Sequence, residues 1–240
     1  MPWYDKTVEH LESDRVYSRN SLISLLRTYN PDVKDSSYNW AITGMLKNNI
    51  IIKRGYDEYS LFEGDIKTNY SPIYSELTNM IMANIKNKYP LIKFTIFETV
   101  LLNEFLNHLI AQNTIYIQVE KDVSIFVFRY LRDEGYENVL YHPSKQDLSL
   151  YWNRNMIVVT NLISEAPITA TDSHSICLEK MLVDIIADKC ISASYSIAEY
   201  KDILSQSLSR YKLDVKKMLR YARRRNKEEY IKNLITNEGA

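Results

Sequence analysis

The stretch from Ser18 to Leu61 constrains the fold of this chain more than any other. Ser18 is suited to cap a helix whose apolar side chains recur at helical spacing up to Tyr29, and the Asn-Pro-Asp sequence at 30–32 then ends it. A second short helix is expected to begin at Ser36 or Ser37 and to end at the Asn-Asn pair at 48–49. Two β-rich segments, 50–53 and 59–62, flank the turn-prone residues 54–57, which is the pattern of a hairpin.

Helix, tight turn, helix and hairpin is the order of a winged helix-turn-helix. In that module the second helix enters the major groove of DNA and the hairpin tip meets the DNA backbone. We therefore predict a winged helix-turn-helix DNA-binding domain over residues 1–63. An additional short helix is expected at 3–12, with Trp3, Val8 and Leu11 packing onto the module.

The outer face of the second helix carries the predicted DNA contacts. If the apolar residues Tyr38, Ile42, Met45 and Leu46 pack inward, the polar residues between them lie outside or at the border. Asn can form a bidentate contact with adenine, Ser and Thr can bond base edges or phosphates, and basic residues at the hairpin tip suit phosphate or minor-groove contact. The predicted DNA-binding residues are Ser36, Ser37, Asn39, Trp40, Thr43, Lys47, Lys53, Arg54 and Tyr56.

Structural alternatives exist for three of these residues. A Trp in a short helix is more often a partly buried anchor against a neighbouring helix than a base-contacting residue, which favours an anchor as the alternative to DNA contact for Trp40. Lys53 and Arg54 could simply keep an exposed sheet edge soluble. The complete order of helix, helix and hairpin favours DNA contact for this pair.

Formal net charge is zero, which is unusual for a DNA-binding protein, but the charge is unevenly distributed. Residues 1–62 carry 8 Lys and Arg against 8 Asp and Glu, residues 63–209 carry 12 against 18, and residues 210–240 carry 10 against 4. Any affinity for DNA must therefore come from a local patch and not from bulk charge.

A second domain is predicted over residues 72–240. The polar stretch from Glu63 to Ser71 is the expected boundary, and Pro72 is expected to open the first helix. Strands and helices then alternate, and the chain becomes helical after Pro167, so we predict an α+β or α/β domain with a mixed sheet and a helical C-terminal part. The expected strands are 91–99, 114–119, 138–141 and 156–163, and the expected helices are 72–85, 100–111, 123–131 (capped by Asp122), 174–188, 196–211 (capped by Ser196), one capped by Asp214, and a last helix to about Thr236.

Composition excludes several classes of protein. Cys177 and Cys190 are too few for a disulfide framework or a zinc site, which fits a reducing cytoplasm. The chain contains no apolar run long enough to span a bilayer, and its N-terminus does not resemble a signal peptide. With 5 Gly, it contains no glycine-rich phosphate-binding loop. We predict no cofactor and no metal.

The best enzymatic alternative rests on the helix at 174–188. Asp184 and Asp188 lie one turn apart and could hold a magnesium ion, which would suit a nucleotide-handling enzyme. The simpler interpretation is that these carboxylates solvate the polar side of an amphipathic helix, with Glu179 and Lys180 as ordinary surface charges.

A basic run near the C-terminus has three interpretations. It could be a solvated helix face, it could pair with the acidic middle of the chain, or it could form a second phosphate-binding surface in which Tyr211 and Tyr221 alternate with basic residues. The residues of this possible second basic surface are Lys216, Lys217, Arg220, Arg223, Arg224 and Arg225.

Two strings of residues resemble a known family. The N-terminal string runs from Trp40 through Leu46-Lys47 and Ile52-Lys53-Arg54-Gly55-Tyr56 to Leu61, and looks like the winged helix at the start of AbiEi-type antitoxins. The C-terminal string, 178–189 with Glu199-Tyr200 and 219–225, resembles the second domain of the same group and is the more specific half.

The resemblance implies an antitoxin of a type IV toxin-antitoxin, or phage abortive-infection, system. Such a bacterial protein is not an enzyme. It represses its own operon by binding double-stranded promoter DNA through its N-terminal domain. Its C-terminal domain counteracts a nucleotidyltransferase-like toxin, usually without a stable complex. We expect a cytoplasmic monomer or weak dimer with no membrane contact. A remaining alternative is a protein-interaction module whose winged helix does not bind DNA.

Overall fold

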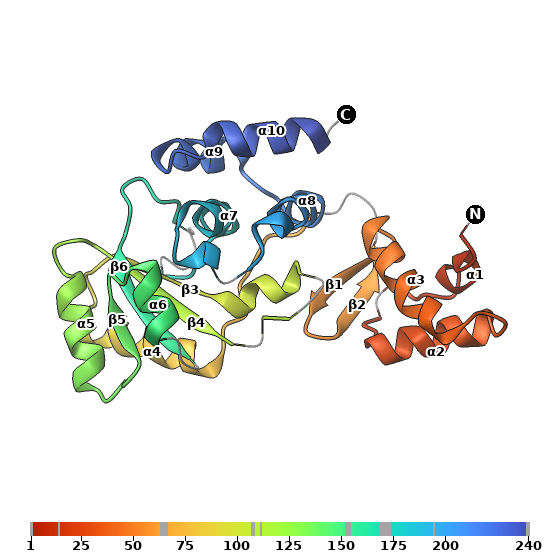
Figure 1. The fold of residues 1–240 in the computed structure, drawn as a ribbon, viewed down its shortest axis with the longest axis horizontal. Coiled ribbons are helices and arrows are strands. Elements are labelled where there is room, and N and C mark those ends of the chain that lie inside the picture. Colours follow the sequence, from red (N-terminus) through yellow and green to blue (C-terminus); the bar gives the residue numbers. More distant parts are fainter. Residues whose placement is uncertain are drawn as a thin grey trace. The chain divides into compact units, whose positions relative to one another are not determined.

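The chain folds into two compact units, Met1–Ile66 and Lys67–Ala240, here called unit 1 and unit 2 (Figure 1). The computed structural model describes residues 2–13, 15–62, 67–106, 109–110, 112–151, 155–168, 174–193 and 195–238. The boundary expected from the sequence lies between residues 63 and 72, and residues 63–66 of that stretch lie outside the described residues.

Unit 1 contains the expected order of helix, helix and hairpin. Ser18 caps α2, because its Oγ accepts a hydrogen bond from the Ser21 N–H at 3.1 Å, as predicted. The second helix starts slightly earlier than expected, at Asp35, so Ser36 and Ser37 lie in its first turn. The described elements are α1 (Asp5–Val8), α2 (Arg19–Tyr29), α3 (Asp35–Lys47), β1 (Ile51–Gly55) and β2 (Glu58–Leu61).

The core of unit 1 joins both longer helices to the hairpin. The expected inward face of α3 is confirmed, and the N-terminal segment packs on the same core through Trp3, Val8 and Leu11. The helix predicted at 3–12 is wrong in length, since only Asp5–Val8 is helical. Buried members of the core include Leu22 and Leu26 of α2, Tyr38, Ile42 and Met45 of α3, and Ile51 and Tyr59 of the hairpin.

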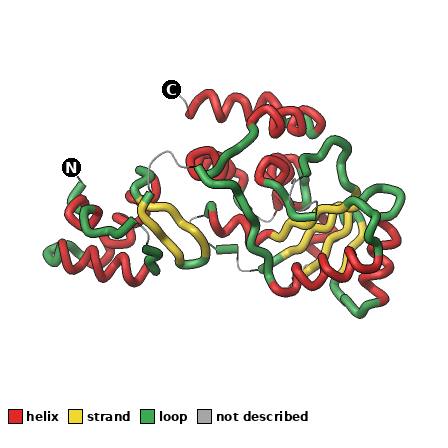
Figure 2. The backbone as a smooth tube through the Cα atoms, turned by 180° about the vertical axis from the view of Figure 1, so that it is seen from behind, coloured by secondary structure: helices red, strands yellow, loops and turns green. Residues whose placement is uncertain are grey.

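Unit 2 is built on a sheet whose strands are drawn in yellow in Figure 2. The strand order is β3-β4-β6-β5. β3 pairs antiparallel with β4, whereas β4, β6 and β5 are parallel to one another. The strands are β3 (Phe94–Glu98), β4 (Thr114–Val119), β5 (Val139–Tyr141) and β6 (Met156–Asn161). This sheet with its helices places the protein in the mixed α+β class.

Helices cover both faces of this sheet (Figure 1). Ile115 and Ile117 of β4 pack toward α4 and α5, while Tyr116 between them packs toward the C-terminal helices, as the two-residue period of a strand requires. The helices of the described part are α4 (Glu76–Lys88), α5 (Ser124–Asp133), α6 (Lys145–Tyr151), α7 (Leu178–Ala187), α8 (Tyr200–Arg210), α9 (Val215–Arg224) and α10 (Glu228–Glu238), with 3₁₀ turns η1 (Thr99–Glu104), η2 (Ile191–Ala193) and η3 (Ile197–Glu199).

Glu98 at the end of β3 fixes the start of α4. Its buried carboxylate accepts hydrogen bonds from the Ser75 N–H at 2.6 Å, from the Thr78 hydroxyl at 2.7 Å and from the Asn113 amide at 2.6 Å. Ser75 is the N-cap of this helix, so the predicted helix start at Pro72 is wrong. A carboxylate at a helix N-terminus is also favoured by the helix dipole.

Other differences from the sequence prediction are local. Of the helix expected at 100–111, the first part is instead the short 3₁₀ turn at Thr99–Glu104, and residues 107, 108 and 111 lie outside the described residues. α6 was not predicted. α5 begins after Val123, without the predicted side-chain cap by Asp122. The predicted cap Asp214 is confirmed for α9. Ser196, which forms a capping box with Glu199, caps the 3₁₀ turn η3 just before α8 and not α8 itself. Among the described residues, no helix combines the length and apolarity that crossing a membrane requires.

Candidate nucleic-acid interface and a buried ionic cluster

One face of α3 is exposed along its whole length. The buried residues Tyr38, Ala41, Ile42 and Met45 define the inner face. The opposite side chains recur at intervals of three or four residues, so they form one stripe on the helix surface. Ser37 lies at the border of this stripe and is half-buried. The exposed residues, here called the α3 stripe, are Ser36, Asn39, Trp40, Thr43 and Lys47.

Trp40 projects from the α3 stripe into solvent with 69% of its surface exposed. The interpretation of Trp40 as a partly buried anchor is therefore wrong. The positions on α3 that pack inward are taken by its neighbours Ala41 and Ile42, both fully buried. An indole in water on an otherwise polar face leaves a large amphipathic side chain available to a partner.

The hairpin presents a different set of residues from the predicted one. β1 continues to Gly55, so Lys53 lies within the strand, pairs in register with Tyr59 and is only 9% exposed. The placement of Lys53 at the hairpin tip is wrong, because strand alternation turns its side chain to the same face as the buried Ile51. Arg54 points the other way, is exposed, and donates from Nε to the Ser60 hydroxyl at 2.7 Å. Tyr56 is at the turn and 74% exposed.

Arg19 belongs to this region, although sequence reasoning did not identify it. Its backbone N–H donates to the Asp57 carboxylate at 2.7 Å, and its guanidinium Nε donates to Asn39 Oδ1 at 3.0 Å. One signal was present in the sequence. A basic residue directly after the N-cap Ser18 is disfavoured by the helix dipole, which indicates that Arg19 has a role other than stabilising the helix.

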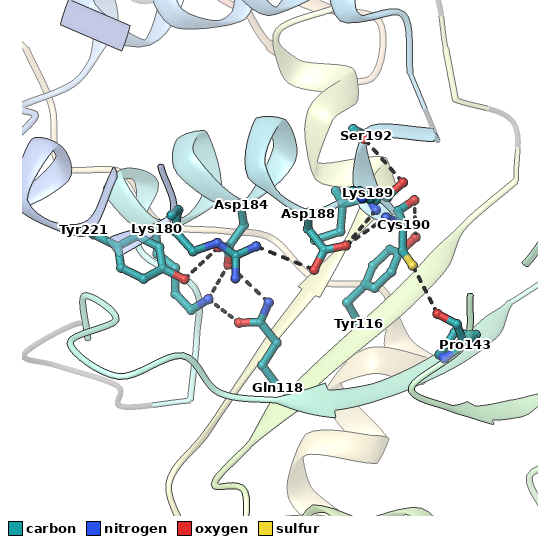
Figure 3. Close-up of polar contacts among 12 residues, drawn as sticks. Tyr116, Gln118, Pro143, Lys180, Asp184, Asp188, Lys189, Cys190, Ser192 and Tyr221 are labelled. Carbon is teal, nitrogen blue, oxygen red and sulfur yellow. Dashed lines mark hydrogen bonds and ion pairs between the residues drawn. The ribbon is translucent and has the colours of Figure 1, made fainter. Parts of the chain in front are cut away.

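Unit 2 holds a second polar constellation, which is buried (Figure 3). Lys180 and Asp184 lie one turn apart on α7, are 0% and 1% exposed, and form an ion pair. Gln118 of β4 accepts from Lys180 and donates to Asp184 at 3.2 Å. Tyr221 of α9 donates its hydroxyl proton to the other oxygen of Asp184 at 2.7 Å. These four residues, here called the buried ionic cluster, join one strand and two helices.

The electrostatics of the cluster oppose ionisation of its phenol. Burial, and then the neighbouring Asp184 carboxylate, raise the pKa of Tyr221 well above its ordinary value, so the phenol remains a hydrogen-bond donor. The Arg225 guanidinium lies at the border, 12% exposed, with its Nε 3.9 Å from Asp184 and a terminal nitrogen 3.7 Å from Asp188. The charged groups here are thus paired within unit 2, because Lys180 and Arg225 lie beside the carboxylates of Asp184 and Asp188.

This geometry corrects the sequence interpretation of α7. Lys180 is not an ordinary surface charge, and Asp184 does not solvate the polar side of the helix. Both oxygens of Asp184 already accept from Lys180, Gln118 or Tyr221, and Asp188 Oδ1 accepts from the Cys190 N–H at 2.8 Å. Within the described residues, no group of three or more His, Cys, Asp and Glu is arranged to hold a metal ion.

The predicted basic surface on α9 is largely engaged within unit 2. Arg223 donates to Glu228 of α10 at 2.6 and 2.9 Å in a bidentate pair. Arg224 donates to the Ser164 hydroxyl at 2.6 Å and lies 3.4 Å from Glu165. The contact of Arg224 with Glu165 agrees with the interpretation that the basic run pairs with the acidic middle of the chain, whereas Arg223 pairs with Glu228 of the C-terminal stretch itself.

The remaining residues of that surface divide into two kinds. Lys217 donates from Nζ to the Ile168 carbonyl at 3.1 Å, and Arg225 faces the buried ionic cluster. Lys216 and Arg220 are exposed. A phosphate-binding role for this helix would thus depend chiefly on these two side chains.

A family model matches residues 37–240, which is most of the chain, under the description "family of unknown function (DUF6577)". The chain belongs to the DUF6577 family. A comparison with curated proteins gave no match. The DUF6577 match starts at Ser37, within α3, and therefore includes Asn39, Trp40 and all of unit 2 but not Arg19.

The DUF6577 match also includes both cysteines, whose thiols are unsuited to nucleophilic chemistry. Burial raises the pKa of the Cys177 thiol to about 11. Burial, and then Asp188, raise the pKa of the Cys190 thiol to about 11 as well. Both side chains therefore carry little thiolate at neutral pH, which argues against a catalytic cysteine.

Proposed function

We propose that this protein is a DNA-binding regulator in which unit 1 acts as a winged helix-turn-helix and α3 enters the major groove. The α3 stripe carries this proposal. It combines an amide, two hydroxyl groups, an ammonium and an exposed indole on one helix face, which are groups that bond base edges and phosphates or pack on a thymine methyl.

The hairpin supports the same proposal. Arg54 and Tyr56 are exposed on β1 and its turn, where a wing would meet the DNA backbone. Because unit 1 carries no excess of positive charge, its affinity would come from these few groups together with Lys47. We therefore expect modest affinity that depends on direct base contacts more than on bulk electrostatics.

We further propose that the regulator is an autoregulating cytoplasmic antitoxin, which binds its own promoter and counteracts a nucleotidyltransferase-like toxin through unit 2. The support is the resemblance to AbiEi-type antitoxins. Two of the segments that carry it in unit 2, 178–189 and 219–225, contribute Lys180, Asp184 and Tyr221 to the buried ionic cluster. The residues that resemble the family thus also hold α7 and α9 together.

The rival of a nucleotide-handling enzyme has weaker support. Its candidate metal ligands were Asp184 and Asp188. The first is buried and paired with an ammonium group, so an entering magnesium ion would have to break that pair and displace the hydrogen bonds from Gln118 and Tyr221.

The test is a fluorescence-anisotropy titration of the full chain against DNA from upstream of its own gene and against a scrambled duplex, at two salt concentrations. We expect tighter, salt-sensitive binding to the upstream DNA. Lys47→Ala should weaken binding and lower the slope of log affinity against log salt by about 1. Lys6→Ala, on the exposed side of α1, is the matched control and should leave both unchanged.

Equal affinity of the wild-type protein for the two duplexes would overturn the proposal, and so would an identical effect of the two lysine variants. Arg54→Ala tests the hairpin separately. Lys53 is unsuitable for that purpose because its side chain is buried and its loss would disturb folding.

A further inference from the structure

Arg19 connects three parts of unit 1. It is the first residue of α2, its backbone N–H is bonded to Asp57 in the hairpin turn, and its guanidinium reaches Asn39 on α3 and the Tyr59 hydroxyl of β2 at 3.4 Å. Asp57 adopts a left-handed backbone conformation with φ of 53°. The half-buried Arg19 side chain therefore lies where the α3 stripe and the hairpin meet.

The hydrogen bond from Arg19 fixes the side-chain amide of Asn39, and the orientation of this amide decides which partners it can bind. A side-chain amide has an acceptor oxygen on one side and a donor nitrogen on the other, and a rotation about its last bond exchanges them. A guanidinium can only donate, so its partner must be the Asn39 oxygen. Arg19 thereby selects one of the two amide orientations before any ligand arrives.

We infer that Arg19 is a specificity-determining positioning residue, which sets the base preference of α3 by holding the side-chain amide of Asn39 in one orientation. The inference rests on the proposed DNA-binding function. Asn39 contacts the base pair in the major groove, with adenine as its favoured partner, and Arg19 acts through it. Preorganisation of this kind saves the cost of ordering the amide during binding.

If Arg19 contributed only its positive charge, the expected result would be different. An arginine near DNA could bind phosphate through its charge alone, and Arg19→Lys would then change little. The planar fork of the guanidinium is what reaches Asn39 and Tyr59 together, and a flexible ammonium does not reproduce that geometry. Arg19→Lys therefore separates charge from positioning.

The experiment measures affinity for the upstream duplex and for a series of duplexes with single base-pair changes across the bound site. We expect Asn39→Ala to lower discrimination at one base pair by about tenfold. Arg19→Lys should lower discrimination at the same base pair to a similar extent while leaving the salt slope unchanged. The double variant should be no worse than Asn39→Ala, because the two residues act as one unit.

Arg27→Lys is the matched control. Arg27 also joins α2 to α3, through an exposed ion pair with Asp35 at 3.0 Å and a guanidinium that lies 5.7 Å from the centre of the Tyr38 ring, and none of these contacts is to Asn39. It should leave discrimination at every base pair unchanged. Thermal melting of each variant checks that unit 1 stays folded at the assay temperature.

Each outcome has a distinct meaning. If the wild-type protein does not distinguish upstream from scrambled DNA, the proposed function fails and the inference fails with it. If the wild-type protein discriminates but Arg19→Lys keeps full discrimination, the inference alone is overturned. Additive losses in the double variant would also overturn it, since Arg19 would then act independently of Asn39.

Discussion

α3 of unit 1 and α7 of unit 2 both carry polar side chains between apolar ones, and they use these polar side chains in opposite ways. On α3, the amide, hydroxyl and indole groups of the stripe face water, and Trp40 is 69% exposed. On α7, Lys180 and Asp184 are buried and bond to each other and to groups from β4 and α9.

The difference separates residues that are available to a partner from residues that organise the fold. Charges inside unit 2 have lost their hydration and must be satisfied internally, so they specify how α7 meets its neighbours. The polar groups of the α3 stripe need no partner within the protein, because water forms hydrogen bonds with them until a ligand binds. Loss of a group should therefore affect stability at α7 and binding at α3.

The largest effect is expected for Lys180→Met, which removes the buried ammonium partner of the Asp184 carboxylate and leaves only the more distant Arg225 guanidinium beside it. We expect a loss of about 3–5 kcal/mol of unfolding free energy, measured by urea denaturation followed by circular dichroism. Lys189→Met, an exposed position just beyond the same helix, should stay within about 0.5 kcal/mol of wild type. Similar stability losses in the two variants would mean that the cluster contributes nothing specific.

A smaller effect, on DNA binding and not on stability, is expected for Trp40→Ala. Its unfolding free energy should change by no more than about 0.5 kcal/mol, since the side chain is in solvent. Its affinity for the upstream DNA should fall by about tenfold, because an aromatic anchor of an interface is lost. Phe126→Ala, which removes an aromatic side chain that is 52% exposed in unit 2, should leave DNA affinity intact. If Trp40→Ala unfolded the protein instead, the α3 stripe would contribute to stability, and the distinction drawn between α3 and α7 would be wrong.

The smallest effect concerns the surface ion pair between α9 and α10. Hydrogen bonds from Arg223 and then Lys232 lower the pKa of Glu228 from 4.5 to about 2. Because the folded-state pKa is depressed, the stabilisation is present above pH 4.5 and is lost as the pH falls toward 2. The melting temperature of Arg223→Gln should therefore be slightly below that of wild type at pH 6, and the two should converge near pH 2. A gap that does not depend on pH would contradict this assignment.

Sequence reasoning succeeded where a structure depends on neighbours in the chain. Ser18 and Asp214 cap their helices through N–H groups three residues away, and the bounds of β4, Thr114–Val119, follow from a local run of β-forming residues. The order of elements in unit 1 was predictable for the same reason.

It failed where the deciding partner is distant in sequence. The burial of Lys180 depends on Gln118, which lies 62 positions earlier, and the Glu98 carboxylate that supports the Ser75 cap of α4 lies 23 positions later in the chain. Helical spacing alone cannot show that a lysine and an aspartate one turn apart face inward. Arg19 was missed because its role is defined by Asn39 and Asp57 and not by any local motif.

The helices that cover one face of the unit 2 sheet come after its strands in the chain, which has a consequence for folding during synthesis on the ribosome. Unit 1 has all its described core residues once Leu61 has left the exit tunnel, so it can fold while the rest is being made. The sheet of unit 2 cannot, because the face that includes Tyr116 and Val158 is covered by helices that begin at Leu178. Until those helices emerge, a growing chain exposes that apolar face, and unit 2 passes through its most aggregation-prone stage late in translation.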